Sequence, residues 1–119
     1  MKSCRKKKSL PAGRQIEKIN VLSGGGVILS PSHRSVFLKD TKIKLQKKEF
    51  DVLKILMEHS GRYLEQEQIL RIVWGEEYSE RASNSLWRVI SVIRGRLSEA
   101  TQGKDYIKAE RDVGYRFSP

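Results

Sequence analysis

The sequence predicts an α+β fold in which a small antiparallel sheet comes first, three helices follow and a β-hairpin ends the chain. Apolar residues alternate in the manner of strands up to Leu45, and from Lys47 they recur with the period of a helix. Two short alternating segments follow the third helical stretch. With 119 residues, 38% of them hydrophobic, the chain has room for one core. We therefore expect residues 1–14 to form a flexible basic arm and residues 15–119 to form one domain.

The first part of the domain is predicted to be a meander of short strands. Turn residues separate the apolar runs at Gly24–Gly26, at Pro31–His33 and at Asp40. Connections this short join neighbouring strands in an antiparallel sheet. The apolar residues assigned to the strands are Ile16, Ile19, Val21, Leu22, Val27, Ile28, Leu29, Val36, Phe37, Leu38, Ile43 and Leu45.

The first two helices are predicted from their apolar periodicity and from the glycines that follow them. The first begins at Lys47 and ends before Gly61, and the second covers residues 65–74 and ends at Gly75. Glycine suits the left-handed position just after a helix. Residues 75–81 then form a polar, acidic loop.

The third helix carries the face of greatest interest. We expect it to run from about Ser85 to Ala100, with Ser83 or Asn84 as its N-cap. Its apolar stripe must face the core and consists of Leu86, Ile90, Ile93 and Leu97. The opposite face is polar and basic, and it presents Asn84, Trp87, Arg88, Ser91, Val92, Arg94 and Gly95.

The end of the chain is predicted to be a β-hairpin. Residues 106–111 and 115–117 form its strands, and Asp112–Gly114 form its turn. A hairpin after three helices is a wing, so the predicted fold is a winged helix-turn-helix. In this fold the third helix enters the major groove of double-stranded DNA. Arginine and asparagine side chains can form paired hydrogen bonds there with guanine and adenine.

The charge of the chain also points to a polyanionic partner. The net charge is +10, and six of the cations lie within residues 1–14. Lysine and arginine side chains that neutralise phosphates release the counterions condensed on nucleic acid. The cations of the arm, Lys6 and Lys7 among them, either contact phosphates or remain solvated.

Other classes of function find little support in the sequence. We expect no metal site and no cofactor, since His33 and His59 lie in different predicted elements and Gly24–Gly26 lack the rest of a nucleotide-binding motif. No nucleophile with a base and no carboxylate pair is placed by spacing, so we expect no enzyme. A single cysteine, Cys4, fits a reducing compartment, and no apolar run is long enough to cross a membrane. We expect a cytoplasmic, nucleoid-associated protein.

Several motifs occur together in one order. They are LQKKEFDVLKILMEHSGRYLEQEQILRIVWG from Leu45, ISVIRGRL at 90–97 and ERDVGYRF at 110–117. This ordered set resembles the effector domain of OmpR/PhoB-type bacterial response regulators, over roughly residues 16–118. The resemblance implies a four-stranded amino-terminal sheet, three helices and a carboxy-terminal wing.

The resemblance also implies roles for individual residues in transcription regulation. Arg111 falls where the wing reaches the minor groove, and loop 75–82 falls where relatives touch RNA polymerase. This makes the acidic loop either a protein contact or a solvated loop. Members bind direct DNA repeats head to tail, which implies a homodimer on DNA. Positions that match base or phosphate contacts are Arg88, Val89, Ser91, Val92 and Arg94, and the acidic residues of the loop are Glu76, Glu77 and Glu80.

The sequence departs from the family pattern at several positions. Trp87 stands where aspartate is frequent, Gly95 where lysine is usual, Asp112 where the wing has glycine, and Gln46 where threonine or serine would cap the first helix. Ala109 cannot donate to phosphate through its side chain. No phosphoacceptor domain precedes the arm, so the chain is either a fragment or a standalone reader.

Two rival functions remain open. Trp87 and Val92 on an exposed face would suit a winged helix that docks onto another protein, although the basic helix and wing favour nucleic acid. The chain can also be a non-specific nucleic-acid binder. RNA binding has less support, because no aromatic platform for single-stranded bases is predicted on the sheet.

Overall fold

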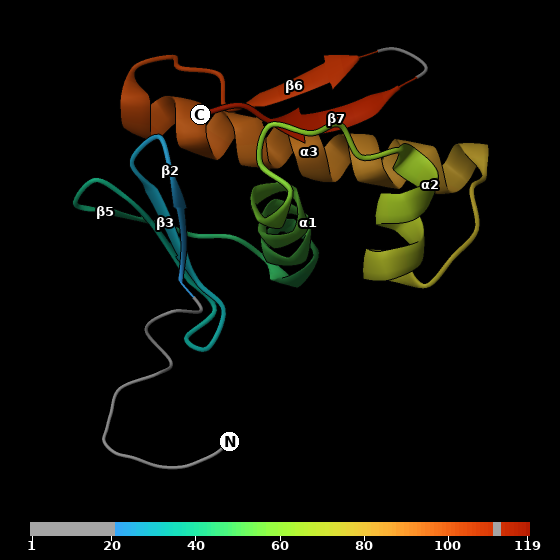
Figure 1. Cartoon of the computed structure of the whole chain (residues 1–119), viewed down its shortest axis with the longest axis horizontal. Helices are drawn as coiled ribbons and strands as arrows, with labels where there is room; N and C mark the ends of the chain where they lie inside the picture. The colour runs from blue at the N-terminus through green and yellow to red at the C-terminus, as the bar shows by residue number, and fades with distance from the viewer. Residues whose placement is uncertain (1–20, 111–112) are drawn as a thin grey trace.

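The computed structural model describes residues 21–110 and 113–119 (Figure 1). An antiparallel sheet is followed by the helices and then by the hairpin, as the sequence predicts. The elements are β2 (Leu22–Gly24), β3 (Val27–Ser30), β4 (Ser35–Leu38), β5 (Thr41–Ile43), α1 (Lys47–Glu58), α2 (Gln66–Ile69), the π-helix η2 (Leu70–Trp74), α3 (Glu80–Thr101), β6 (Ile107–Glu110) and β7 (Gly114–Phe117).

Strands β2 to β5 form a four-stranded antiparallel sheet in the order β2-β3-β4-β5, which confirms the predicted meander and the four strands that the resemblance implied. Successive side chains of a strand point to opposite faces of the sheet, so every second residue faces the helices. The buried residues on that face are Val27, Leu29, Val36, Leu38 and Ile43. Ile28 and Phe37 pair on the opposite face and are exposed. Ile16 and Ile19, which were assigned to the first strand, lie outside the described residues.

The tight turn between β2 and β3 connects the sheet to the end of the chain. The Tyr106 hydroxyl donates a hydrogen bond to the Gly25 carbonyl at 2.7 Å. A Cβ on Gly25 would lie 2.8 Å from the Tyr106 ring and 2.8 Å from Pro119, and the φ of Gly25 is +58°. Only glycine therefore fits this turn without moving its neighbours.

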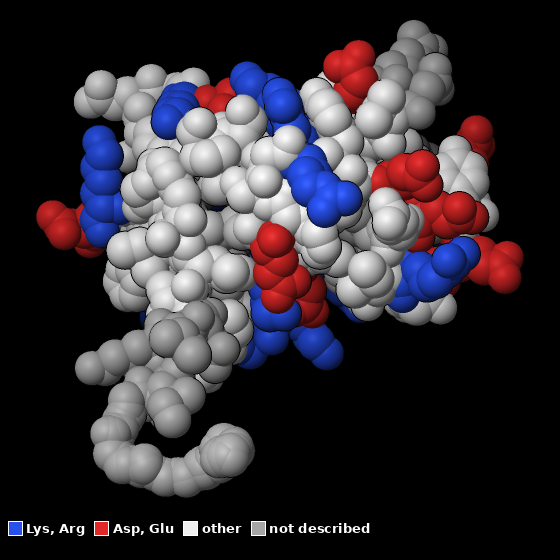
Figure 2. All heavy atoms as spheres, viewed as in Figure 1, with Lys and Arg blue, Asp and Glu red and all other residues white. Residues whose placement is uncertain are grey.

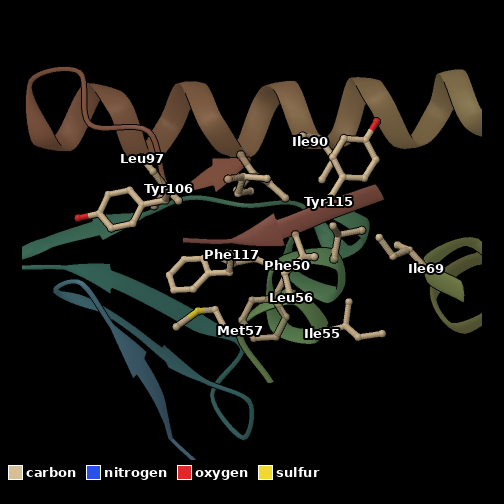
Figure 3. Close-up of a cluster of buried hydrophobic side chains, with 14 of the residues drawn as sticks. Phe50, Ile55, Leu56, Met57, Ile69, Ile90, Leu97, Tyr106, Tyr115 and Phe117 are labelled. Carbon is tan, nitrogen blue, oxygen red and sulfur yellow. The ribbon is translucent and has the colours of Figure 1, made fainter. Parts of the chain in front are cut away.

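The core lies between α1, α3 and the hairpin (Figure 3). In Figure 3, Phe117 and Tyr115 of β7 project between the two helices, and Ile90 and Leu97 reach down from α3. Leu64 joins the hairpin through a short bridge: its N–H donates to the Tyr115 carbonyl at 2.8 Å, and the Tyr115 N–H donates back at 3.0 Å. The wing is thus attached to the helical body by backbone hydrogen bonds.

The third helix begins earlier than the sequence analysis predicted. Helix α3 starts at Glu80, and its N-cap is Ser79, whose hydroxyl accepts a hydrogen bond from the Ala82 N–H at 3.0 Å. Ser83 and Asn84 lie inside the helix. The helix begins earlier because Ala82, which is 4% exposed, also packs into the core. It lies one turn before Leu86 and lengthens the apolar stripe of α3 toward the N-terminus of the helix. The preceding loop is shortened to residues 75–79.

The first two helices follow the prediction closely. Helix α1 begins at Lys47, and the Glu49 carboxylate accepts a hydrogen bond from the Gln46 N–H at 2.8 Å, so the start of the helix is capped without a serine or threonine. The second helix reaches Trp74 as predicted, but its last turn is the wider η2. Carbonyls at a helix end lack intrahelical partners, and here the Lys48 ammonium donates to the Val73 carbonyl at 2.9 Å.

Candidate nucleic-acid interface

One face of α3 is open to solvent along most of the helix. Buried residues recur on the inner side, from Ala82 to Leu97. The side chains on the far side point away from the core because the helix turns by about 100° per residue. We call this set the outward row; it consists of Arg81, Asn84, Arg88, Ser91, Val92 and Gly95, and all of them are exposed.

The polar members of the outward row have no partner within the part of the chain that the structure describes. Asn84, Arg88 and Ser91 make no side-chain hydrogen bond there, and no carboxylate lies within 4.0 Å of Arg88. Their donors and acceptors are therefore available to a ligand. Two apolar side chains accompany them on the exposed side: Trp87 is 49% exposed and Val92 is 37% exposed.

Arg94 is placed differently. Its guanidinium forms a two-pronged contact with Asp105, with Nε 3.2 Å from Oδ1 and Nη2 2.9 Å from Oδ2. Lys108 of β6 approaches the same carboxylate at 3.8 Å. The Ile107 N–H also donates to Asp105 at 3.3 Å. Asp105 thus links α3 to the start of the wing, and it neutralises part of the charge that the sequence assigned to DNA.

Val89 also differs from the other predicted contacts, because it is half-buried and packs against the core. It borders a depression of about 360 Å³ between α3 and the start of α1. Lys48 and Trp74 lie in the wall of this depression, with the Lys48 ammonium 5.4 Å from the centre of the Trp74 ring. Arg88 also lines this depression.

A second cleft on the same flank of α3 was missed by sequence reasoning. It has a volume of about 320 Å³ and lies between β5 and the C-terminal turns of α3. Its cations are Lys42, Lys44 and Arg96. Arg96 could have been found from its spacing, since it follows Arg88 by eight residues and Val92 by four. Nothing in the local pattern shows that β5, with Lys42 in it and Lys44 just after it, lies beside Arg96.

The hairpin forms the predicted wing beside α3. Burial raises the pKa of the Tyr115 hydroxyl above its usual value of 10.0, and the nearby charge of Arg94 opposes part of that shift. Ala109 is exposed on β6. Arg111 and Asp112, which sequence analysis placed at the minor groove and at the turn, lie outside the described residues, as do Lys6 and Lys7.

The acidic loop is exposed, as Figure 2 shows by the carboxylates gathered at the end where η2 is joined to α3. Glu76 and Glu77 lie in the loop, whereas Glu80 belongs to the first turn of α3. A negative charge at this end of a helix stabilises it by interacting with the helix dipole. Tyr78 between them is 54% exposed.

Within residues 21–110 and 113–119, no three metal-binding side chains gather in one place. No helix in those ranges is long and apolar enough to span a membrane.

Comparison with known proteins agrees with the fold described above. A sequence profile described as "Transcriptional regulatory protein, C terminal" matches residues 40–117, more than half of the chain. The chain belongs to this family of OmpR/PhoB-type DNA-binding domains. The family consists of DNA-binding domains of transcription regulators and is not a class of enzymes.

Two curated regulators and one crystal structure illustrate the similarity. Regulatory protein VanR of Enterococcus faecium is 26% identical over 106 residues, which is 89% of this chain and 46% of VanR. VanRB of Enterococcus faecalis is 34% identical over 93 residues, 78% of this chain and 40% of VanRB. The Klebsiella pneumoniae RstA DNA-binding domain, solved in complex with the RstA box, is 28% identical with a TM-score of 0.73, covering 83% of this chain and 97% of RstA's. The chain spans less than half the length of these curated regulators.

Proposed function

We propose that this domain binds double-stranded DNA in a sequence-specific manner, with α3 in the major groove and the hairpin β6–β7 at the adjacent minor groove. The observation that carries the proposal is the outward row, in which Asn84, Arg88 and Ser91 are exposed and without partners among the described residues. An α-helix fits the major groove, where arginine pairs with guanine and asparagine with adenine. The related RstA DNA-binding domain was solved in complex with the RstA box, which supports DNA as the ligand of this domain.

The proposal is tested by selecting binding sites from random duplex DNA with the purified chain. A salt concentration of about 150 mM shortens the range of electrostatic attraction to roughly 8 Å and so suppresses non-specific binding. We expect a short motif, repeated at about one helical turn if two copies bind head to tail. Recovery of random sequence, together with binding that vanishes as salt rises, would contradict sequence-specific reading.

A second function, docking onto another protein, is favoured by the exposed Trp87 and Val92. Aromatic side chains of this kind frequently anchor protein interfaces. The substitution Trp87→Ala separates the two functions: in a DNA reader it changes the affinity for the selected duplex, whereas in a docking module it changes only capture of the protein partner.

Two further contacts belong to the same proposal. Glu76 and Glu77, with Glu80 at the start of α3, offer an acidic surface to RNA polymerase, and their exposure supports it. The basic arm with Lys6 and Lys7 adds phosphate contacts on the strength of its charge. A protein with these contacts acts at the nucleoid in the bacterial cytoplasm. Substitution of the three glutamates by uncharged glutamine is expected to lower transcription activation and leave DNA affinity unchanged.

A further inference from the structure

We propose that the cleft between β5 and the C-terminal turns of α3 binds a phosphate group of the DNA backbone, so that the sheet takes part in DNA binding together with the recognition helix. The inference rests on the proposed function and adds to it a contact between this cleft and a backbone phosphate. The cleft is lined by Thr41, Lys42, Ile43, Lys44, Arg96, Glu99 and Ala100.

The charge of this cleft favours an anion. Lys42, Lys44 and Arg96 are exposed, and none of them has a carboxylate within 4.0 Å in the described part of the chain. Glu99 is the single acidic residue in the lining. Three cations and one carboxylate around a volume of about 320 Å³ give a positive hollow with room for a phosphate group.

The position of the cleft on α3 favours DNA backbone over a free anion. Helix α3 has 22 residues and is therefore about 33 Å long, whereas the major groove is only about 12 Å wide and curves around the duplex. A straight helix of that length cannot stay in the groove along its whole length. When Asn84 and Arg88 meet base edges, the C-terminal turns approach the wall of phosphates.

The orientation of Arg96 agrees with this placement. It follows Arg88 by eight residues, so it lies about 12 Å further along the helix and is rotated by roughly 80° toward β5. Strand β5 is the edge of the sheet and packs against α3 (Figure 1). Lys42 of this strand and Lys44, which follows it, therefore line the same cleft as Arg96, on the flank of α3 that faces away from Asp105 and the wing. The wing and the cleft can thus contact the two phosphate walls of one groove.

The test compares duplex binding by the wild-type chain, the double variant Lys44→Ala/Arg96→Ala and the control Arg62→Ala over a series of salt concentrations. Arg62 is an exposed cation in the turn after α1 and outside the cleft. Each lost phosphate contact lowers the magnitude of the slope of log K against log salt by about 0.9, so we expect a loss of roughly 0.9 for the double variant, whose two cations hold one phosphate, and none for the control. Equal slopes for the double variant and the control would overturn the inference.

Two additional measurements locate the contact. Replacement of single phosphates by uncharged methylphosphonates is expected to reveal at least one position that weakens binding of the wild type and not of the double variant. An unchanged profile in the double variant would count against the cleft. Glu99→Gln removes the one negative charge of the lining and is expected to tighten binding at every salt concentration; unchanged affinity would contradict an anion in this cleft.

The outcome is separable from that of the proposed function. If a motif is selected and the slopes are equal, only the cleft assignment fails. If no motif is selected but the double variant still lowers the slope, the cleft holds phosphate and sequence reading by the outward row fails. The substituted side chains are exposed, so equal thermal unfolding of all variants shows that the effect lies in binding.

Discussion

The two flanks of α3 hold their cations in opposite ways. On the wing side, Arg94 and Lys108 share the carboxylate of Asp105, and Arg116 of β7 lies 4.8 Å from the centre of the Tyr63 ring. On the outward row and the β5 side, Arg88 and Arg96 have no such partner in the described part of the chain. Because the cations near the wing have internal partners, the net charge of +10 overstates the charge that a ligand meets there. The difference between the flanks also separates residues that hold the wing in place from residues that are open to DNA.

The sharpest contrast is expected between Arg88→Ala and Arg94→Ala. Loss of a paired base contact costs about 1–3 kcal/mol and relaxes preference at one base position. Arg88→Ala should therefore weaken binding of the selected duplex by about 5-fold to 150-fold and leave unfolding unchanged. Arg94→Ala should chiefly lower stability. Titration of duplexes mutated at each position measures this, and equal loss of preference in both variants would erase the contrast.

The link between α3 and the wing is expected to contribute less than the base contacts but to act on stability. Asp105→Ala removes a carboxylate that accepts from Arg94 and from the Ile107 N–H. A charged hydrogen bond is worth about 1.5–3 kcal/mol, and partial exposure of this pair brings the expected cost to about 1–2 kcal/mol. Chemical denaturation measures it. The control Glu67→Ala removes one end of a longer, more exposed ion pair with Arg71 and should cost much less.

The start of α3 provides a further test on the same helix. Ser79→Ala removes the hydroxyl that caps the Ala82 N–H, which typically costs about 1 kcal/mol. Asn84→Ala serves as the control because Asn84 was a predicted cap, lies inside the helix and makes no side-chain hydrogen bond within the described residues. A larger loss of stability for Asn84→Ala than for Ser79→Ala would contradict the observed start of the helix.

The smallest expected effect concerns pH. Burial raises the pKa of Tyr115 in the folded state, so the neutral hydroxyl is favoured there. Its contribution to stability is present below the unfolded pKa of about 10 and is lost as the pH rises toward the folded pKa. Tyr115→Phe should therefore reduce the fall in melting temperature above pH 10. An identical decline in wild type and variant would mean that Tyr115 does not couple ionisation to folding.

The sequence predicted correctly those features that depend on the apolar pattern within a single helix or strand. The stripe from Leu86 to Leu97 predicts both the inner and outer faces of α3, and the apolar alternation predicts the four strands. The start of α3 was not predicted correctly, because Ser79, Ser83 and Asn84 are all good N-caps and only burial of Ala82 decides among them.

The contacts that distinguish the two flanks are non-local, and for that reason the sequence did not reveal them. Asp105 reaches Arg94 across the loop between α3 and β6. Lys42 and Lys44 line one cleft with Arg96 because β5, more than fifty residues earlier in the chain, packs against α3. Periodicity assigns a side chain to a face of its own element, but it does not state which other element lies beside that face.

Methylation interference on the selected duplex is the decisive measurement for base reading by the outward row, because methylation of guanine N7 changes the chemistry of the major groove alone. We expect N7 methylation at one or more guanines to block binding of the wild-type chain, and interference at one of them to disappear in Arg88→Ala. If N7 methylation never interferes, or if the two profiles are identical, the outward row of α3 does not read the major groove.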